Sequence, residues 1–293
     1  MANYNHIAPA RYILEDAIRT NDELGHDNLG SLSYSHGFLP RTQPITHLPA
    51  SHRAWDDIAA DIPRLFRSYA VRKGVHDLPI LHATIEHLPD LYLLRASSLF
   101  SILAHLYWYC EPENPEKGIP PQIQIPWQEI TLRLDRLAPH LSFIDLNSHN
   151  WQFIDPTLEQ PFVVENLRLA IPMAGNEDER RFQTAPIEMM YLFSPLMDAM
   201  LQAQEATLRD DPETLKEALV FISDAIKHLT YVSLMKVNPN PYNELYINPV
   251  VWGKTAALFA SPFQQESIPG PSGTAIPSFT ALDIFFGRKS YST

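Results

Sequence analysis

Proline is abundant in this chain and glycine is scarce: the 293 residues include 26 prolines and only 10 glycines. Tight β-hairpin turns depend on residues that adopt positive φ, above all glycine, so a protein of many strands and hairpins is disfavoured. Proline is tolerated in the first turn of a helix and interrupts a helix elsewhere. The composition therefore predicts a mainly α protein whose helices are separated by proline-rich irregular segments.

Apolar residues make up 45% of the chain and charged residues 19%, which is typical of a globular protein with a large core. The single cysteine, Cys110, excludes a disulfide framework and cysteine-rich metal sites. The net charge is −12 without a cluster of basic residues, so we expect no nucleic acid and no anionic membrane as a partner. The N-terminus has no basic stretch followed by an apolar run, and we expect a cytoplasmic protein.

Leu91–Cys110 is the most apolar segment, but it contains Arg95 and His105, so it predicts a buried core helix rather than a membrane span. Apolar residues at spacings of three and four predict several other helices. The expected helical stretches are Arg11–Arg19, His52–Leu65 with a kink or break at Pro63, Ile80–Tyr109 with one at Pro89, Trp127–Leu137, Glu177–Leu208 and Ser278–Phe286. The residues between Pro120 and Pro126 are expected to be extended.

The clearest helix start in the sequence is Asp211 followed by Pro212. Aspartate is a favoured N-cap and proline is favoured at the first helical position. Leu215, Leu219, Ile222, Ile226 and Leu229 then recur at spacings of 4, 3, 4 and 3. This pattern predicts a helix to about Met235, which the prolines of Val237–Pro241 end.

Histidines and small residues are the places to look for a site. His82 and His87 are five residues apart, a spacing that would point them apart on a helix, and there is no HExxH motif. A self-contained metal site is therefore not expected, and His105 is expected to be a core histidine. The Gly270–Thr274 loop is either an ordinary loop or a cradle for an anionic group. No GxSxG motif supports a serine hydrolase.

A series of short motifs runs in a fixed order over about residues 36–288. The series is His36-Gly37-Phe38-Leu39-Pro40, Leu48-Pro49, Trp55 with Ile58-Ala59, His87-Leu88-Pro89-Asp90, Arg95-Ala96, Ile119-Pro120-Pro121, Ala138-Pro139-His140-Leu141, Asn150-Trp151, Asp155-Pro156, Glu188, Val237-Asn238-Pro239, Trp252-Gly253, Gly270-Pro271-Ser272-Gly273 and Leu282-Asp283. In this order the motifs resemble the indoleamine 2,3-dioxygenase superfamily. The ordered set carries the resemblance, because each motif alone is weak.

The resemblance implies a mostly helical protein in which a small N-terminal domain, residues 1–118, covers a larger helical domain, residues 119–293, that holds heme b. It implies that dioxygen binds the ferrous heme iron and that an indole or tryptophan-derived substrate stacks in an apolar pocket above it. In that family the C2–C3 bond of tryptophan is cleaved to give N-formylkynurenine. Other members of the superfamily use the same pocket for different tryptophan chemistry in secondary metabolism.

The resemblance also assigns pocket positions. Ser272 and Gly273 match the family's Gly-Ser-Ala loop, which lies over the heme near a propionate. Phe143 matches a pocket position usually held by tyrosine, and Leu146 and Asn147 match its neighbours in the pocket wall.

Two further positions follow from the same resemblance. Thr184 falls near a small hydroxyl position on the distal side of the heme, although Arg180-Arg181-Phe182 fits the family's aromatic pair poorly. Tyr242 matches an aromatic residue that lines the substrate pocket after Asn238-Pro239.

The sequence departs from the family pattern in two places. Tyr242–Pro249 contains no arginine to bind a substrate carboxylate, which argues against ordinary tryptophan. The family's iron-binding histidine lies well downstream of the Gly-Ser loop, and the sequence given ends at Thr293 without it. Three explanations stay open: a longer natural chain, a second polypeptide that supplies the missing helices, or loss of heme ligation.

Two classes of function therefore follow. The first is a heme-dependent enzyme that acts with dioxygen on an indole-type substrate, or a heme enzyme that catalyses a different reaction in secondary metabolism. The second is a helical binding or partner protein that keeps the fold without heme. No residue is predicted to act as a catalytic acid or base.

Overall fold

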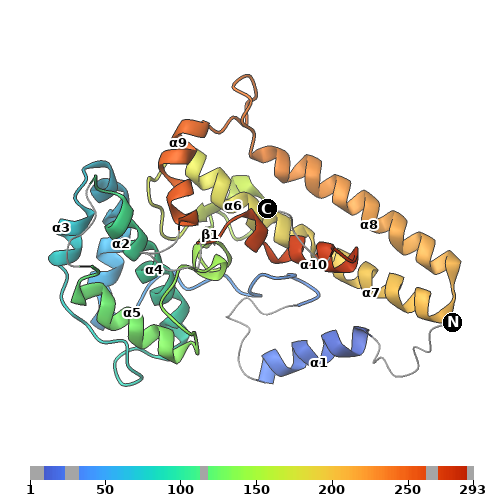
Figure 1. Ribbon diagram of the computed structural model, residues 1–293, viewed down its shortest axis with the longest axis horizontal. Coiled ribbons are helices and arrows are strands. Elements are labelled where there is room, and N and C mark those ends of the chain that lie inside the picture. Colours follow the sequence, from blue (N-terminus) through green and yellow to red (C-terminus); the bar gives the residue numbers. More distant parts are fainter. Residues whose placement is uncertain (1–9, 24–32, 113–117, 262–269, 289–293) are drawn as a thin grey trace.

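The computed structural model describes residues 10–23, 33–112, 118–261 and 270–288. As predicted, the chain is mainly α-helical (Figure 1). The α-helices are α1 Ala10–Glu23, α2 Arg53–Arg67, α3 Val71–His76, α4 Leu93–Tyr109, α5 Pro121–Arg133, α6 Glu177–Leu192, α7 Ser194–Arg209, α8 Pro212–Val232, α9 Pro249–Lys254 and α10 Pro277–Phe285. The shorter turns are Ala50–His52, Asp90–Tyr92, Ile144–Ser148, Val164–Asn166, Leu234–Lys236, Ala256–Ala260 and Gly273–Ala275. Strands β1 (Trp151–Phe153) and β2 (Leu167–Leu169) pair antiparallel, with Trp151 opposite Leu169.

The apolar core has two parts. One cluster gathers α2, α3, α4 and α5, which form one group of helices in Figure 1. The other gathers α6, α7, α8, α10 and the two strands. Phe143 packs on the second cluster and Leu146 belongs to the first, so the segment between α5 and β1 joins the two. The division into domains at residues 118 and 119 stays a prediction.

Helix α4 is the central helix of the first cluster. Its residues from Leu93 to Tyr107 are all buried, which confirms the predicted core helix. His105 is only 1% exposed, its Nδ1 lies 3.2 Å from the Ser101 carbonyl oxygen, and burial lowers its pKa to about 4. At neutral pH His105 is therefore an uncharged core histidine.

Three helices continue through a proline, which was expected at Pro186 but not at Pro63, the predicted kink or break, or at Pro126, the predicted end of an extended stretch. Pro63 lies inside α2, Pro186 inside α6 and Pro126 inside α5. The predicted extended stretch before Trp127 is wrong, because Pro121 occupies the first turn of α5. The apolar residues Ile123, Trp127 and Ile130 are buried on one side of α5, and this packing offsets the hydrogen bond lost at Pro126.

The expected helix over residues 80–89 is also wrong, because this segment forms turns and irregular backbone up to Pro89. Tertiary contacts hold it: Arg133 Nη1 donates to the carbonyl oxygens of Ala83 and Leu88 at 2.6 and 2.7 Å. Since the segment is not a helix, the rings of His82 and His87 are not pointed apart, and their centroids lie 5.8 Å from each other. Within the described residues, however, no group of three or more His, Cys, Asp or Glu side chains could hold a metal ion.

The predicted helix Glu177–Leu208 is divided into α6 and α7 at Phe193, with Pro195 in the first turn of α7. The start of α8 is confirmed: the Asp211 carboxylate accepts the Thr214 N–H at 3.1 Å. The segment Pro212–Lys236 has the length and hydropathy of a membrane span, and 22% of its most apolar window is buried. One such helix is weak support for a membrane span, because the core helix of a globular protein passes the same test.

Gly37 lies in the loop before α2, at φ +62°, and a Cβ there would lie 2.7 Å from the Met190 carbonyl oxygen. We expect Gly37→Ala to lower the free energy of unfolding by about 2 kcal/mol, from backbone strain and this collision together. Urea denaturation measures the change. Gly118→Ala is the matched control, because φ is +73° and no atom lies within 4 Å of its Cβ position. Equal losses in both variants would show that the contact with Met190 is unimportant.

Candidate functional site

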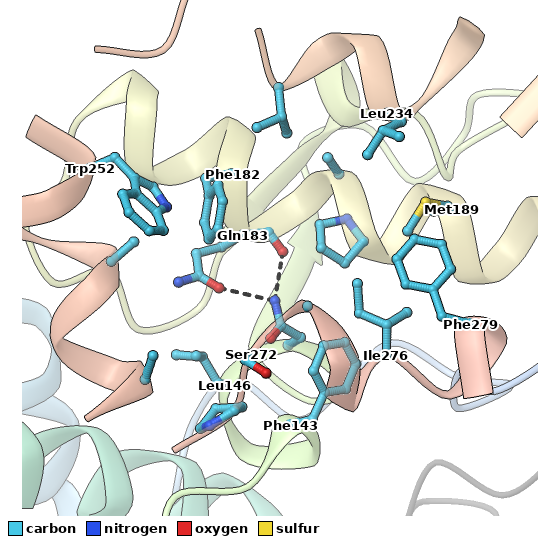
Figure 2. A pocket seen from close by; sticks show the side chains of 18 of the residues that line it. Phe143, Leu146, Phe182, Gln183, Met189, Leu234, Trp252, Ser272, Ile276 and Phe279 are labelled. Carbon is cyan, nitrogen blue, oxygen red and sulfur yellow. Dashed lines mark hydrogen bonds between the residues drawn. The ribbon is translucent and has the colours of Figure 1, made fainter. Parts of the chain in front are cut away.

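A cavity of about 400 Å³ lies between α6, α9, α10, the turn that follows α8 and the turn Ile144–Ser148 (Figure 2). Most of its lining is apolar, and aromatic rings come from several elements. The lining residues are Phe143, Leu146, Asn147, Phe182, Gln183, Ala185, Pro186, Met189, Ser233, Leu234, Val237, Trp252, Ala256, Ala257, Ala260, Pro271, Ser272, Gly273, Ile276 and Phe279. None of these lining residues carries a formal charge. A cavity of this size and character suits an uncharged aromatic molecule.

The π-helical turn Ile144–Ser148 carries two lining residues, Leu146 and Asn147. Asp145 anchors the turn to the protein interior, because it is fully buried and both of its carboxylate oxygens accept hydrogen bonds from Arg136. Ser97 and Ser142 also donate hydroxyl protons to Asp145, each at 2.6 Å. Burial alone would raise the pKa of Asp145, but the Arg136 charge and these hydrogen bonds hold it below its usual value. The turn therefore rests on a buried, ionised network.

Helix α6 forms one wall of the cavity through Phe182, Gln183, Pro186 and Met189. Asn176 is the N-cap of this helix, and its side chain accepts the Glu179 N–H at 2.8 Å. The spacing of three and four residues places these side chains along one face of the helix. Pro186 has no N–H to donate, so α6 lacks one backbone hydrogen bond at this position, and the burial of Ile187, Met189 and Met190 offsets that loss.

The segment after α8 is tied to α6 by Glu188, which is 1% exposed. One oxygen of its carboxylate accepts the Ser233 hydroxyl at 2.9 Å, and the other accepts Lys236 Nζ at 2.9 Å. The Val164 N–H also donates to this carboxylate, at 2.6 Å. These bonds hold Leu234 and Val237 at the cavity, and they occupy the hydroxyl proton of the lining residue Ser233.

Gly270, Ser272 and Gly273 belong to the loop that reaches the cavity before α10. At Gly270 a Cβ would lie 1.7 Å from the Phe259 carbonyl oxygen, so only glycine allows the loop to pass so close to that backbone. Ser272 and Gly273 are exposed and line the cavity. The role of this loop beside a heme or an anionic group stays a prediction.

The structure brings together five of the seven predicted pocket residues at the cavity: Phe143, Leu146, Asn147, Ser272 and Gly273. Thr184 is fully buried but does not line the cavity, and its hydroxyl donates to the Arg180 carbonyl oxygen at 2.8 Å. Tyr242 is 95% exposed, in the loop between α8 and α9, away from the lining.

Sequence reasoning missed Gln183, Pro186, Met189, Trp252, Ile276 and Phe279. The helical spacing of Phe182, Pro186 and Met189 was a usable signal, since it marks one face of α6. Thr184, which the family resemblance assigned to the pocket, lies on α6 next to this face. The resemblance therefore identified the correct helix but not the face that lines the cavity. Trp252 contacts Phe182 with ring centroids 5.5 Å apart, a pairing between distant segments that no local pattern indicates.

The cavity walls fit part of what a heme group requires. Apolar side chains and aromatic edges suit the body of a flat macrocycle. The described lining residues include no histidine, cysteine or tyrosine, and Met189 is the only one of them with a side chain type that ligates heme iron. The described lining residues could therefore pack against the heme macrocycle, but they provide no imidazole to bind its iron.

Cys110 offers no nucleophile, because it is buried and its pKa is raised to about 12 by burial. We expect its alkylation by iodoacetamide at pH 8 to be slower than that of a free thiol by about a thousandfold, since the thiolate is the reactive form. Mass spectrometry of the folded chain measures this rate, and the chain unfolded in urea is the control. Rapid alkylation of the folded chain would contradict the burial of this thiol.

Comparison with known proteins gives a consistent result. Over 184 residues the chain is 26% identical to indoleamine 2,3-dioxygenase 1 of Rattus norvegicus, covering 63% of this chain and 44% of the relative. Over 203 residues it is 29% identical to indoleamine 2,3-dioxygenase 2 of Homo sapiens, covering 68% of this chain and 48% of the relative. Over 292 residues it is 24% identical to a 6-hydroxytryptophan 2,3-dioxygenase of Fusarium equiseti, covering 93% of this chain and 68% of the relative.

The chain thus spans about half the length of the first two relatives and about two thirds of the third. The family profile described as Indoleamine 2,3-dioxygenase matches residues 31–249, which is most of the chain. This range includes α2 to α8, the turn Ile144–Ser148 and 11 of the 20 residues that line the cavity. The helical fold, the ordered motifs and this match agree, and the chain belongs to the indoleamine 2,3-dioxygenase family.

Proposed function

We propose that this chain forms the wall of a heme- and substrate-binding site in a dioxygenase-type enzyme that acts on an indole or tryptophan-derived molecule. The observation that carries the proposal is the 400 Å³ cavity, lined by apolar and aromatic side chains, in a chain of this family. The names of the relatives support it, since each is a 2,3-dioxygenase of an indole compound or of a hydroxytryptophan.

Heme b, when bound, would supply the activation of dioxygen, which protein side chains cannot perform. The chain's own residues would bind and orient the substrate and keep water away from it. Phe143, Phe182 and Trp252 offer aromatic faces and edges to an indole ring, and Ser272 and Gly273 would lie beside the heme. An imidazole for the iron would have to come from outside the described lining residues.

The substrate part that enters this cavity would be uncharged. No lining residue is a lysine or arginine, so a carboxylate placed there would have no ionic partner. This supports the expectation from the sequence that ordinary tryptophan is a poor ligand for the described part of the site. A decarboxylated indole, or a tryptophan derivative whose charged end stays at the rim, fits better.

A second candidate function follows from one observation, the lack of a histidine among the described lining residues. A protein of this family that binds an aromatic molecule without heme would need no iron ligand. This binding protein would retain the cavity and lose the oxygen chemistry.

Turnover by the hemin-loaded, dithionite-reduced full chain under labelled dioxygen separates these functions. Indole, L-tryptophan and 6-hydroxytryptophan are offered as substrates, and mass spectrometry follows the products. We expect incorporation of both atoms of labelled dioxygen into one indole-type substrate. Hemin binding without such a product would contradict dioxygenation of these substrates, and indole binding without hemin binding would identify the binding protein.

A further inference from the structure

Two buried amide side chains meet at the wall of the cavity, one from the turn Ile144–Ser148 and one from α6. Asn147 Nδ2 donates to the backbone carbonyl oxygen of Gln183 and to its side-chain Oε1, both at 3.0 Å (Figure 2). Asn147 is 4% exposed and Gln183 is 3% exposed. This double hydrogen bond fixes the orientation of both amides.

These two hydrogen bonds leave one amide donor group and one amide acceptor atom unused. Gln183 Nε2 and Asn147 Oδ1 have no hydrogen-bond partner among the described residues. Neither atom is among the described polar side-chain atoms that are both inaccessible to solvent and without a hydrogen-bond partner. Gln183 Nε2 shares its amide carbon with Oε1, and Asn147 Oδ1 shares its amide carbon with Nδ2. Both atoms therefore lie next to the hydrogen bond between Nδ2 and Oε1. Both residues line the cavity, and the Gln183 amide nitrogen points away from the bond in Figure 2.

An amide donor and acceptor next to apolar walls are costly unless a ligand or water satisfies them. No hydrogen bond joins another described lining side chain, Ser233, Ser272 and Trp252 included, to either atom, and Ser233 donates its hydroxyl proton to Glu188 instead. A hydroxyl group both donates and accepts a hydrogen bond, so it matches a wall that offers one amide donor and one amide acceptor. A charged group would be placed in a cavity without a counter-ion.

We propose that the Asn147–Gln183 pair selects an aromatic ligand that carries a ring hydroxyl over the same ring without one. Gln183 Nε2 donates to the hydroxyl oxygen, and Asn147 Oδ1 accepts its proton. Asn147 also acts as the positioning residue for the Gln183 amide. The inference rests on the proposed function in one respect, that an indole-type ring occupies the cavity.

Calorimetric titration of the full chain with indole and with the ring-substituted hydroxyindoles and methoxyindoles tests the proposal. We expect the best hydroxyindole to bind about tenfold more tightly than indole, because two hydrogen bonds are gained. The matching methoxyindole only accepts, so it is expected to fall between the two. Equal affinity for indole and for every hydroxyindole would overturn the inference and leave the proposed function in place, whereas no binding of any indole would remove both.

Selectivity in variants separates recognition from a structural role. Gln183→Met keeps a side chain of similar length without the amide, so the ratio of hydroxyindole to indole affinity is expected to fall to about one. Asn147→Leu is expected to lower the same ratio. The matched control is Gln202→Met on α7, whose side chain donates to Asp198 on the surface and whose ratio is expected to be unchanged. A retained ratio in folded Gln183→Met would contradict the proposal even if its overall affinity were lower.

Discussion

Asp145→Ala will lower the free energy of unfolding by about 3–5 kcal/mol, because it leaves the mostly buried Arg136 without its partner and Ser97 and Ser142 without their acceptor. Urea denaturation followed by circular dichroism measures the loss. The matched control is Asp77→Ala, which removes the exposed ion pair with Lys73 and is expected to cost less than about 0.5 kcal/mol. A similar loss in both variants would contradict the importance assigned to the Asp145 network.

The same network predicts how stability depends on pH. Because the pKa of Asp145 is lowered in the folded chain, its contribution is fully present above the ordinary carboxyl pKa and is lost as pH falls through the folded value. We expect Asp145→Asn to be less stable than the native chain at pH 7. We also expect the two stabilities to converge as the pH falls below about 4. This network holds the turn that carries Leu146 and Asn147, so ligand binding should weaken together with stability.

Ala257→Trp is expected to weaken the binding of both hemin and indole by more than about tenfold. Ala257 is half-buried and lines the cavity, so the added indole ring would occupy a large part of the 400 Å³ without entering the packed core. Titration followed by absorbance and by calorimetry measures the two affinities. Ala60→Trp places the same side chain at an exposed position of α2 and should leave both affinities unchanged.

A folded Ala257→Trp variant with native affinity for both ligands would place the binding site elsewhere. Circular dichroism and thermal unfolding establish that the variant is folded. Loss of hemin binding with retained indole binding would show that the two ligands occupy separate parts of the molecule, against the proposal that they share this wall.

Local chemistry made some elements predictable from the sequence. Asp211 and Pro212 start α8 because an N-cap hydrogen bond and a fixed φ act within one turn. The core position of α4 was predictable because this is the most apolar segment of the chain, even though Arg95 and His105 interrupt it. By contrast, residues 80–89 are held off a helix by Arg133, about 45 positions away, and no local pattern contains that information.

The site was predictable only as far as the ordered family motifs extended. They identified Phe143 and Asn147 at the cavity, because the turn Ile144–Ser148 keeps its place between α5 and β1. They missed Gln183, because a shift of one residue on α6 turns a side chain by about 100°. Tyr242 lies in a loop where spacing carries little structural information, and it is exposed.

Titration of the purified full chain with hemin, followed by absorbance before and after dithionite reduction, tests the central claim most directly. The proposal predicts a saturable Soret band at one hemin per chain that shifts on reduction and on addition of carbon monoxide. It also predicts that indole perturbs this band, because both ligands contact the same wall. Absence of a saturable band, with indole still bound, would contradict the heme enzyme and leave an aromatic-binding protein of this family.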